Sequence, residues 1–425
     1  MYKDNFTFIH AADIHLDSPL HGLERYEGAP VEEIRSATRR AFDNLIEVAI
    51  DEEVAFILLA GDLYDGDWKD YNTGLYFVER MGRLRDAGIR VFIVAGNHDA
   101  ASQITKHLRL PDNVTLFSTR RPECVVLNDL NVSICGQGFA TRAVTDDISQ
   151  DYPQGDPQLL NIGLLHTCLD GKPGHEPYAP CTIDGLRSKG YQYWALGHVH
   201  KREEVSEDPW IVFPGNIQGR HIREVGPKGC TLVTVEGGEI VEVVHRDLDV
   251  MRWSICEHDV SATETVDDIY EQVREGLQSA LDASEGRPVA VRLVLHGACS
   301  AHLKLNADRE RWIQEYRALA TGLGGAGIWL EKGSIKTKPA ISADEVLERV
   351  DALSGLLRAI HDMELDAPAV DELADEISVL RQKLPAELLA GDDPFDPISP
   401  EFLKDTLEDI KELLVNRLLS TENGS

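Results

Sequence analysis

The sequence feature that most constrains the fold is a short apolar run, residues 91–95, that stops at Gly96-Asn97-His98-Asp99. Five apolar residues ending at a glycine are typical of a buried strand in a doubly wound sheet, and such sheets bind ligands at the carboxyl ends of their strands. We therefore expect Asn97 and His98 to be presented at a site and not buried. An amide, an imidazole and a carboxylate in a row can serve as a metal ligand, a proton donor and the group that orients the donor. A plain polar turn is the competing interpretation of this tetrapeptide alone.

Strand and helix patterns alternate along the first hundred residues. Apolar strands are predicted at 8–12 and 55–60, and helices with an apolar stripe at 30–51 and 72–87. This order is typical of an α/β layered fold, in which chain direction places the polar strand ends at one edge. After residue 112 the pattern changes to short β runs separated by Gly, Pro, Asn and Asp. The strands predicted there are 114–116, 124–127, 132–135, 162–165, 193–196, 211–213, 231–235 and 240–244. We expect a two-sheet sandwich flanked by helices, with a surface loop at 150–161.

A second α/β pattern begins near Met251. Its predicted elements are a strand at 253–256, a helix opened by Thr265 and Asp268, a strand at 289–295, a helix after Asn306 and a strand at 327–330. This βαβαβ order predicts a small, compact domain. The sequence thus predicts three domains, at 1–250, 251–340 and 341–425, the last of them helical and acidic.

Only helices are predicted after residue 339. One begins at Ser342 with Glu345, a second covers 367–384, and a third begins at Ser399-Pro400-Glu401, where a cap residue and a first-turn proline stand in their preferred positions. The third helix carries a stripe of apolar residues, Leu403, Leu407, Ile410, Leu414 and Leu418. The stripe is either core packing or a face that binds a partner.

The charge and the cysteine content limit the possible functions. The net charge is −31, and residues 341–425 hold 21 acidic against seven basic side chains, which argues against nonspecific nucleic-acid binding over the whole surface but not against a local basic surface. The seven cysteines are scattered and never spaced as CxxC, so we expect reduced thiols and neither a disulfide frame nor a zinc site. The chain has no apolar signal segment and no apolar run of about 18 residues, so a soluble cytoplasmic protein is expected, with no membrane contact.

Five polar stretches each come directly after an apolar strand. They contain Asp13 and His15, then Asp62, then Asn97 with His98, then His166, and finally His198 with His200. Each pair occurs often by chance, but together they offer seven candidate ligands of the mixed oxygen and nitrogen type that holds two divalent ions, with one Asp left to bridge them.

These motifs resemble those of the calcineurin-like metallophosphoesterases, and within that family the SbcD-type and YhaO-type DNA repair nucleases. The matching motifs are DxH at Asp13–His15, GD at Gly61-Asp62, GNHD at Gly96–Asp99, a single His at His166 and GHxH at Gly197–His200. Residues 193–198 and 214–221 are also similar to this nuclease branch. The resemblance covers residues 6–250 well and the βαβαβ module less well.

The resemblance implies a role for each of these side chains. Asp13, His15, Asp62 and His200 would hold one ion, and Asp62, Asn97, His166 and His198 the other. His98 would steady the phosphate and protonate the leaving oxygen, with Asp99 orienting it. Imidazole, carboxylate and one amide together suit manganese best, with iron and zinc as alternatives.

The residues after the GD motif narrow the choice of substrate. Phosphatases of the superfamily carry an arginine shortly after this motif, whereas this chain reads Leu63-Tyr64-Asp65 and then Gly66-Asp67. Some related nucleases have a His where this chain has Asp65, so Asp65 either helps to place DNA or caps a helix or turn. Basic residues are the expected contacts to DNA backbone phosphates. They are Arg120, Arg121, Lys201, Arg202, Arg220, Arg223, Lys332, Lys336 and Lys338.

Together with this resemblance, the sequence favours a manganese-dependent DNA nuclease, and the resemblance implies 3′ to 5′ exonuclease activity on duplex ends and endonuclease activity on single strands. The βαβαβ module would then cap the site and limit which DNA enters. A phosphodiesterase or phosphatase for a small molecule is the main alternative, and a non-catalytic scaffold is a third. Because the chain lacks a GxxxxGK[ST] loop, it is not expected to hydrolyse ATP. By resemblance, an SMC-like ATPase of the SbcC or YhaN kind would bind the C-terminal helices, and the helix at 30–51 is a candidate for homodimer formation.

Overall fold

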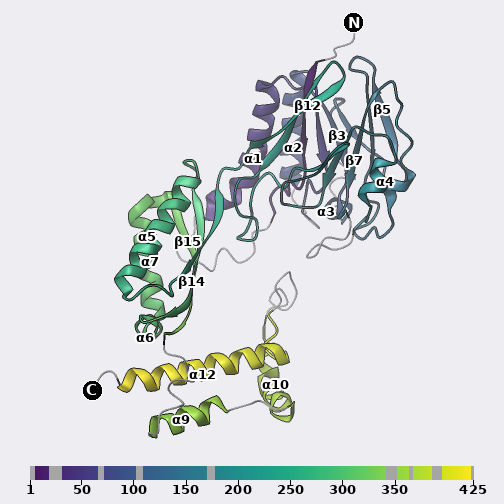
Figure 1. Cartoon of the computed structure of the whole chain (residues 1–425). Helices are drawn as coiled ribbons and strands as arrows, with labels where there is room; N and C mark the ends of the chain where they lie inside the picture. The colour runs from purple at the N-terminus through teal and green to yellow at the C-terminus, as the bar shows by residue number, and fades with distance from the viewer. Residues whose placement is uncertain are drawn as a thin grey trace. The chain divides into compact units, whose positions relative to one another are not determined.

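Two six-stranded sheets lie within the first 250 residues (Figure 1). The structure is a computed structural model that describes residues 5–18, 31–65, 71–101, 109–169, 178–340, 352–362, 367–384 and 395–422. The first sheet has the strand order β12-β11-β1-β2-β3-β4 and the second β5-β6-β7-β8-β10-β9. The predicted two-sheet α/β sandwich is confirmed.

The first sheet is parallel over four strands. These are β1 (Phe6–Ala11), β2 (Phe56–Ala60), β3 (Arg90–Val94) and β4 (Val114–Leu116), and the hairpin of β11 (Gly229–Glu236) and β12 (Glu239–Asp247) pairs antiparallel with β1. Helices α1 (Val31–Asp51) and α2 (Tyr71–Asp86) pack on its outer face, and the short α3 (Asn97–Ala101) comes after β3. Parallel strands with helices between them point their carboxyl ends to one edge.

The second sheet consists of β5 (Glu123–Leu127), β6 (Val132–Gln137), β7 (Leu160–His166), β8 (Tyr193–Gly197), β9 (Glu203–Glu207) and β10 (Trp210–Phe213). Strands β6, β7, β8 and β10 are parallel, and β5 and β9 are antiparallel edges. The sequence patterns missed β9, because its residues Glu203–Glu207 are mostly charged, as is common for an exposed edge strand.

The core explains why the central strands are apolar without interruption. In β2, Phe56, Leu58 and Ala60 face the second sheet, whereas Ile57 and Leu59 face α1 and α2. A strand covered on both faces has no solvent side, so every position is apolar. The same double burial applies to Phe92 and Ile93 of β3.

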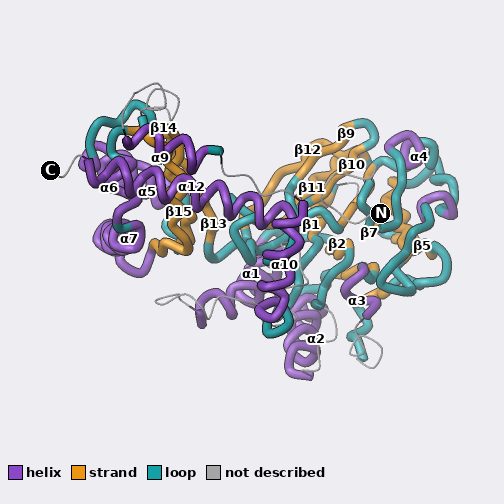
Figure 2. Tube along the Cα trace, turned by 90° about the horizontal axis from the view of Figure 1, so that it is seen from below, coloured by secondary structure: helices purple, strands orange, loops and turns teal. Residues whose placement is uncertain are grey.

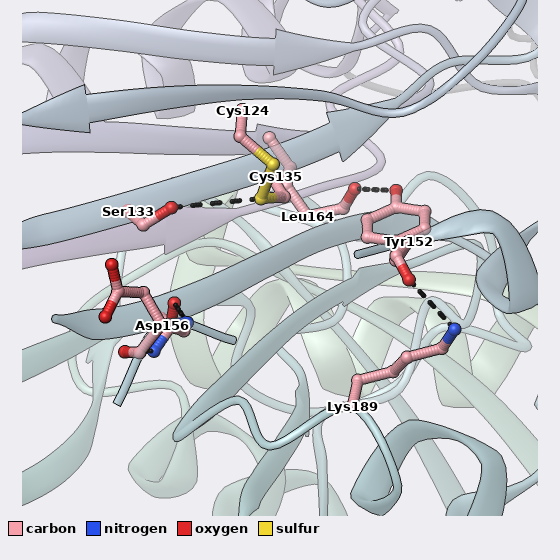
Figure 3. Close-up of a disulfide and its surroundings, with 8 residues drawn as sticks. Cys124, Ser133, Cys135, Tyr152, Asp156, Leu164 and Lys189 are labelled. Atoms are coloured by element: carbon pink, nitrogen blue, oxygen red, sulfur yellow. Dashed lines mark hydrogen bonds between the residues drawn. A yellow bond between two sulfur atoms is a disulfide. The ribbon is translucent and has the colours of Figure 1, made fainter. Parts of the chain in front are cut away.

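The segment at 150–161 is not only a surface loop. It begins in the one-turn helix η2 (Ile148–Asp151), and Tyr152 is buried, with its hydroxyl donating to the carbonyl of Leu164 at 2.8 Å (Figure 3). Lys189 donates to the carbonyl of Tyr152 at 2.9 Å. These contacts hold the segment against β7 and α4 (Ile183–Arg187).

The βαβαβ order predicted after Met251 is present. Strands β13 (Arg252–Asp259), β14 (Val289–Cys299) and β15 (Ile328–Pro339) form a sheet in that order, and α5 (Val266–Ala283), α6 (His302–Ala307), α7 (Arg309–Gly324) and the short η3 (Gly325–Gly327) connect them. Helices α5 and α7 lie on one side of this sheet (Figure 1 and Figure 2). Thr265 and Asp268 exchange hydrogen bonds of 3.0 and 3.1 Å at the start of α5, which confirms the predicted cap.

Helices come after this sheet in the described part of the tail. They are α9 (Ala352–His361), α10 (Ala367–Arg381) and α12 (Pro400–Glu422), and the Ser399 hydroxyl accepts from the Phe402 amide at 3.1 Å as the predicted cap. The helix predicted to start at Ser342 lies outside the described residues. Among the described helices, none combines the length and apolar composition that a membrane crossing requires.

Two compact units emerge from the contacts within the chain. The first contains residues 1–255, 278–292 and 323–331, and the second contains 256–277, 293–322 and 332–425. The starts of β14 and β15 therefore belong to the same unit as the two large sheets. The three-domain division remains a prediction.

The expectation that all seven cysteines are reduced is wrong for one pair. Cys124 and Cys135 form a disulfide, with their Cα atoms 4.1 Å apart (Figure 3). The antiparallel register of β5 and β6 places them directly opposite one another, which explains the bond. The other five cysteines, all in the described part of the chain, are buried and form no disulfide.

The disulfide can be tested by counting thiols. Alkylation of the protein unfolded without reductant should modify five cysteines, and prior reduction should raise the number to seven. Cys124→Ser should lower the free energy of unfolding by about 2–3 kcal/mol, because the unfolded chain is no longer constrained. Modification of all seven cysteines before reduction would contradict the bond.

Candidate metal centre

The carboxyl ends of five strands bring all seven predicted ligands to one place. Asp13 and His15 come after β1, Asp62 after β2 and Asn97 after β3, His166 ends β7, and His198 and His200 come after β8. Three groups of side chains have ligand atoms within 4.8 Å of one another and could each hold a metal ion. They are Asp13, His15 and His200, then His15, Asp62 and His98, and finally Asp13, Asp62 and His166.

The imidazole rings point their Nε2 atoms at each other and at the carboxylates. Nε2 of His15 lies 3.3 Å from Nε2 of His200 and 3.9 Å from Oδ2 of Asp62. Nε2 of His166 lies 2.9 Å from Oδ1 of Asn97 and 3.5 Å from the same Asp62 oxygen. Asp62 thus faces His15 of the first expected ligand set and His166 of the second, as expected of a bridging carboxylate.

The loops need unusual backbone to approach this closely. Asp13, His15, Asp62 and His198 all have positive φ angles, of 51°, 46°, 52° and 103°. Side chains at Gly96 and Gly197 would overlap the Asp62 carboxylate and the Ala60 carbonyl. Left-handed backbone in residues other than glycine costs of order 1–3 kcal/mol each and is typical of functional sites. Asn97 is buried, contrary to expectation, because it turns inward to His166.

The donor set fits divalent cations. Burial, together with the charge of Asp62, raises the pKa of Asp13 well above its usual range, and burial likewise raises the pKa of Asp62. Burial lowers the pKa of His166 to about 3, so this ring is neutral, the form that binds metals. Its Nδ1 lies 2.9 Å from the Ala60 carbonyl and must donate to it, which leaves the Nε2 lone pair facing Asp62. Neighbouring cations would stabilise both the carboxylates and these lone pairs.

The partner of His98 is Asp65 and not Asp99, which corrects the role expected for Asp99. Nδ1 of His98 lies 2.7 Å from Oδ1 of Asp65. Asp99 is buried and accepts instead from the backbone amides of Leu63, Tyr64 and Gly96 at 3.2, 2.9 and 2.9 Å. Asp99 therefore ties the loop after β2 to the loop after β3.

Asp65 also sets the protonation of His98. Burial lowers the pKa of His98, but the hydrogen bond to Asp65 and the charges of Asp62 and Asp65 outweigh burial and raise it above its usual value. The side chain of His98 is 31% exposed, so it can reach a substrate. Sequence analysis singled out Asp65 because some related nucleases have a His at this position, but it did not identify Asp65 as the partner of His98.

Glu224 is a side chain of the site that the sequence analysis did not single out. It is buried, and its Oε1 lies 2.7 Å from Nδ1 of His200. Burial raises the pKa of Glu224, but the hydrogen bond from His200 and the charge of Arg220 hold it well below its usual range.

The predicted DNA contacts have different positions. Arg220 lies inside the site, with a side chain only 12% exposed. Arg202 is half-buried and pairs with Glu204. The side chains that are exposed are Arg120, Arg121, Lys201, Arg223, Lys332, Lys336 and Lys338, and the last three lie on the part of β15 that belongs to the second unit.

A two-sheet fold with a mixed carboxylate, imidazole and amide cluster at its strand ends defines a metal-dependent phosphoester hydrolase. The chain belongs to the calcineurin-like metallophosphoesterases: residues 6–202 match the calcineurin-like phosphoesterase family, and residues 253–338 match the middle domain of metallophosphoesterase YhaO. It is 37% identical over 297 residues to the uncharacterized metallophosphoesterase YhaO of Bacillus subtilis, covering 69% of this chain and 72% of that protein.

More distant relatives include DNA double-strand break repair proteins named Mre11. The one from Sulfurisphaera tokodaii is 24% identical over 307 residues, covering 68% of this chain and 73% of that protein. The one from Methanopyrus kandleri is 26% identical over 295 residues, covering 63% and 62%. Among solved structures, TT1561 of Thermus thermophilus has a TM-score of 0.34 at 14% identity, and a dimetal phosphatase from Danio rerio has 0.33 at 12%; each match covers 57% of this chain and 99% of the other.

Two conservative substitutions separate the roles of Asp65 and Asp99. Asp99→Asn should lower the free energy of unfolding by about 1–3 kcal/mol, because one of the buried amides then faces an amide group that cannot accept its hydrogen. Asp65→Asn should lower kcat for bis-p-nitrophenyl phosphate at least tenfold, since His98 loses its charged partner. Denaturant titration and steady-state kinetics measure the two effects. A loss of activity without destabilisation in Asp99→Asn would make Asp99 the residue that orients His98.

Proposed function

We propose that the protein is a metal-dependent DNA repair nuclease, with 3′ to 5′ exonuclease activity on duplex ends and endonuclease activity on single strands. The observation that carries the proposal is the convergence of five carboxylate and imidazole ligands, Asp13, His15, Asp62, His166 and His200, beside a solvent-accessible His98. Oδ1 of Asn97 lies 2.9 Å from Nε2 of His166, and the His198 ring lies 5.2 Å from the His166 ring. The relatives named as double-strand break repair proteins support DNA as the substrate.

The roles proposed for the ligands follow the family resemblance, and the group formed by Asp13, His15 and His200 supports the first of the two sets. Asp13, His15 and His200 would hold one ion, and Asn97, His166 and His198 the other, with Asp62 shared. Two divalent ions in such a site activate a water molecule and neutralise charge on the phosphodiester. Manganese is the proposed metal, because imidazole, carboxylate and one amide together suit it better than they suit magnesium.

His98 is the proposed proton donor to the leaving oxygen. Its Nδ1 hydrogen is engaged by Asp65 at 2.7 Å, so Nε2 is the nitrogen that can face the substrate. The raised pKa of His98 keeps a larger fraction of the ring protonated near neutral pH, as an acid requires.

Substitution of a donor and of a ligand should have different effects. His98→Leu should abolish cleavage of an end-labelled duplex while both ions stay bound, because His98 is proposed to bind no metal. Asp62→Ala should lose both ions, because Asp62 is the shared ligand. Calorimetric titration of the metal-free proteins with Mn²⁺ gives the number of bound ions. Loss of metal in His98→Leu would overturn its assignment as a donor.

A parallel assay distinguishes the proposed nuclease activity from the alternative, a phosphodiesterase activity on small molecules. Labelled duplex and single-stranded DNA are incubated with the protein across a manganese titration, in parallel with bis-p-nitrophenyl phosphate. Shortening of DNA supports the nuclease. Hydrolysis of the nitrophenyl ester with no cleavage of DNA, with or without an ATPase partner, would favour the alternative.

The exposed basic residues are the proposed contacts to the DNA backbone. Lys332 and Lys336 lie on β15 of the 251–340 domain, which we propose to be a DNA-capping domain. Arg120, Arg121, Lys201 and Arg223 are exposed on the first unit. Arg202 is proposed as a further contact beside the end of β8.

Replacement of Lys332 and Lys336 should weaken DNA binding through lost phosphate contacts. The double variant Lys332→Gln, Lys336→Gln should reduce the slope of log K against log salt by about 1–2 and leave hydrolysis of bis-p-nitrophenyl phosphate unchanged. Fluorescence anisotropy at several salt concentrations measures the slope. An unchanged slope would show that these lysines do not contact DNA.

The proposed partner is an SMC-like ATPase of the SbcC or YhaN kind, bound by the C-terminal helices. Support comes from the apolar stripe of α12, where Leu403 is buried but Ile410 and Leu414 are 45% and 36% exposed. We also propose a cytoplasmic location and, through α1, a homodimer.

A further inference from the structure

The segment after β10 returns to the metal centre and adds charged side chains that the ligand motifs do not include. Residues 214–228 connect β10 to β11, and the backbone amide of Asn216 donates to the carbonyl of His200 at 3.3 Å. Lys228, which is buried, donates to the same carbonyl at 2.9 Å. Residues near the two ends of this segment thus both bind the carbonyl of the ligand His200.

Glu224 occupies the centre of the segment and uses both of its oxygens. Oε2 accepts from the Asn216 side chain at 2.9 Å and from the Arg220 amide at 2.7 Å, while Oε1 accepts from Nδ1 of His200 at 2.7 Å. A carboxylate only accepts, so His200 must carry its hydrogen on Nδ1. The Nε2 lone pair of His200 then points toward His15 and Asp13, at 3.3 and 3.9 Å.

Arg220 extends from Glu224 across to the His98 side of the centre. One terminal nitrogen donates to Oε1 of Glu224 at 3.2 Å. The other lies 3.4 Å from the hydroxyl of Ser18 and 3.7 Å from Oδ2 of Asp65, so its contacts there are long. The guanidinium is therefore anchored at one end and can still donate at the other.

We propose that Glu224 is a positioning residue with two partners: it fixes the tautomer and orientation of His200 for metal binding, and it anchors Arg220 to bind a non-bridging oxygen of the scissile phosphate. This inference rests on the proposed function, because Arg220 can contact the scissile phosphate only if the metal centre binds a phosphoester. A guanidinium suits that task because its planar donors match phosphate oxygens. A buried carboxylate behind a ligating imidazole typically affects metal affinity tenfold to a hundredfold.

The first part of the proposal is tested by metal binding alone. Calorimetric titration of the metal-free protein with Mn²⁺ should show tenfold to hundredfold weaker binding of one ion in Glu224→Gln, and full binding of both ions in Arg220→Gln. Glu236→Gln, an exposed change on β11, is the matched control. Glu224→Asp keeps the charge, shortens the reach and should lose part of the affinity, which covers the case in which Glu224→Gln does not fold.

The second part is tested with inorganic phosphate in the presence of saturating Mn²⁺. Arg220→Gln should bind phosphate at least tenfold more weakly, whereas Arg85→Gln, an exposed arginine in the last turn of α2, should match the wild type. Wild-type Mn²⁺ affinity in folded Glu224→Gln and Glu224→Asp would overturn the role of Glu224. Unchanged phosphate affinity in Arg220→Gln would overturn the role of Arg220. Neither readout uses DNA, so a failure of DNA cleavage is distinguishable from a failure of this inference.

Discussion

The structure depends on two buried carboxylates placed close together. Asp13 and Asp62 have almost no contact with water, and burial disfavours the charge that each would carry. An isolated buried charge costs several kcal/mol unless it is paired. Burial lowers the pKa values of the adjacent histidines His15 and His166, so these rings are neutral and cannot balance the carboxylates. Bound divalent cations would resolve this conflict, because they attract both carboxylates and neutral imidazole nitrogens.

The cluster is possible because the scaffold directs the ligand loops to one edge and ties them to packed elements. Three of them come after parallel strands of one sheet, and two after parallel strands of the other, so their polar ends meet at one edge. Positive φ angles at Asp13 and His15 turn side chains that would otherwise diverge. Asp17, the next residue with a positive φ in this loop, pairs with Arg39 of α1, which anchors the strained loop to a packed helix. Burial of the helix faces thus offsets the strain in the ligand loops.

Most of what could be predicted from the sequence follows from the spacing of its apolar residues. The uninterrupted apolar runs of β2 and β3 and the stripe of α1 identified the strands and the ligand edge, because chain direction fixes where parallel strands end. The disulfide was not predicted, although pairing residues 124–127 with 132–135 as a hairpin places the two cysteines opposite one another. The pairing of Asp65 with His98 and of Glu224 with His200 was not predicted, because neither carboxylate comes directly after a strand and both pairs join residues distant in the sequence.

The position of Arg220 changes one argument about the substrate. The chain has no arginine directly after the GD motif. In this respect it differs from the phosphatases of the superfamily, which bind a terminal phosphate with an arginine at that place. In the folded chain, however, a terminal nitrogen of Arg220 lies 3.7 Å from Asp65, three residues after Asp62. A distant segment thus supplies positive charge close to the same loop. The absence of an arginine after the GD motif is therefore not a reason to prefer a phosphodiester over a phosphate monoester as the substrate. Discrimination between them has to come from contacts farther from the metal centre, where a long polyanion reaches exposed basic side chains and a small ester does not.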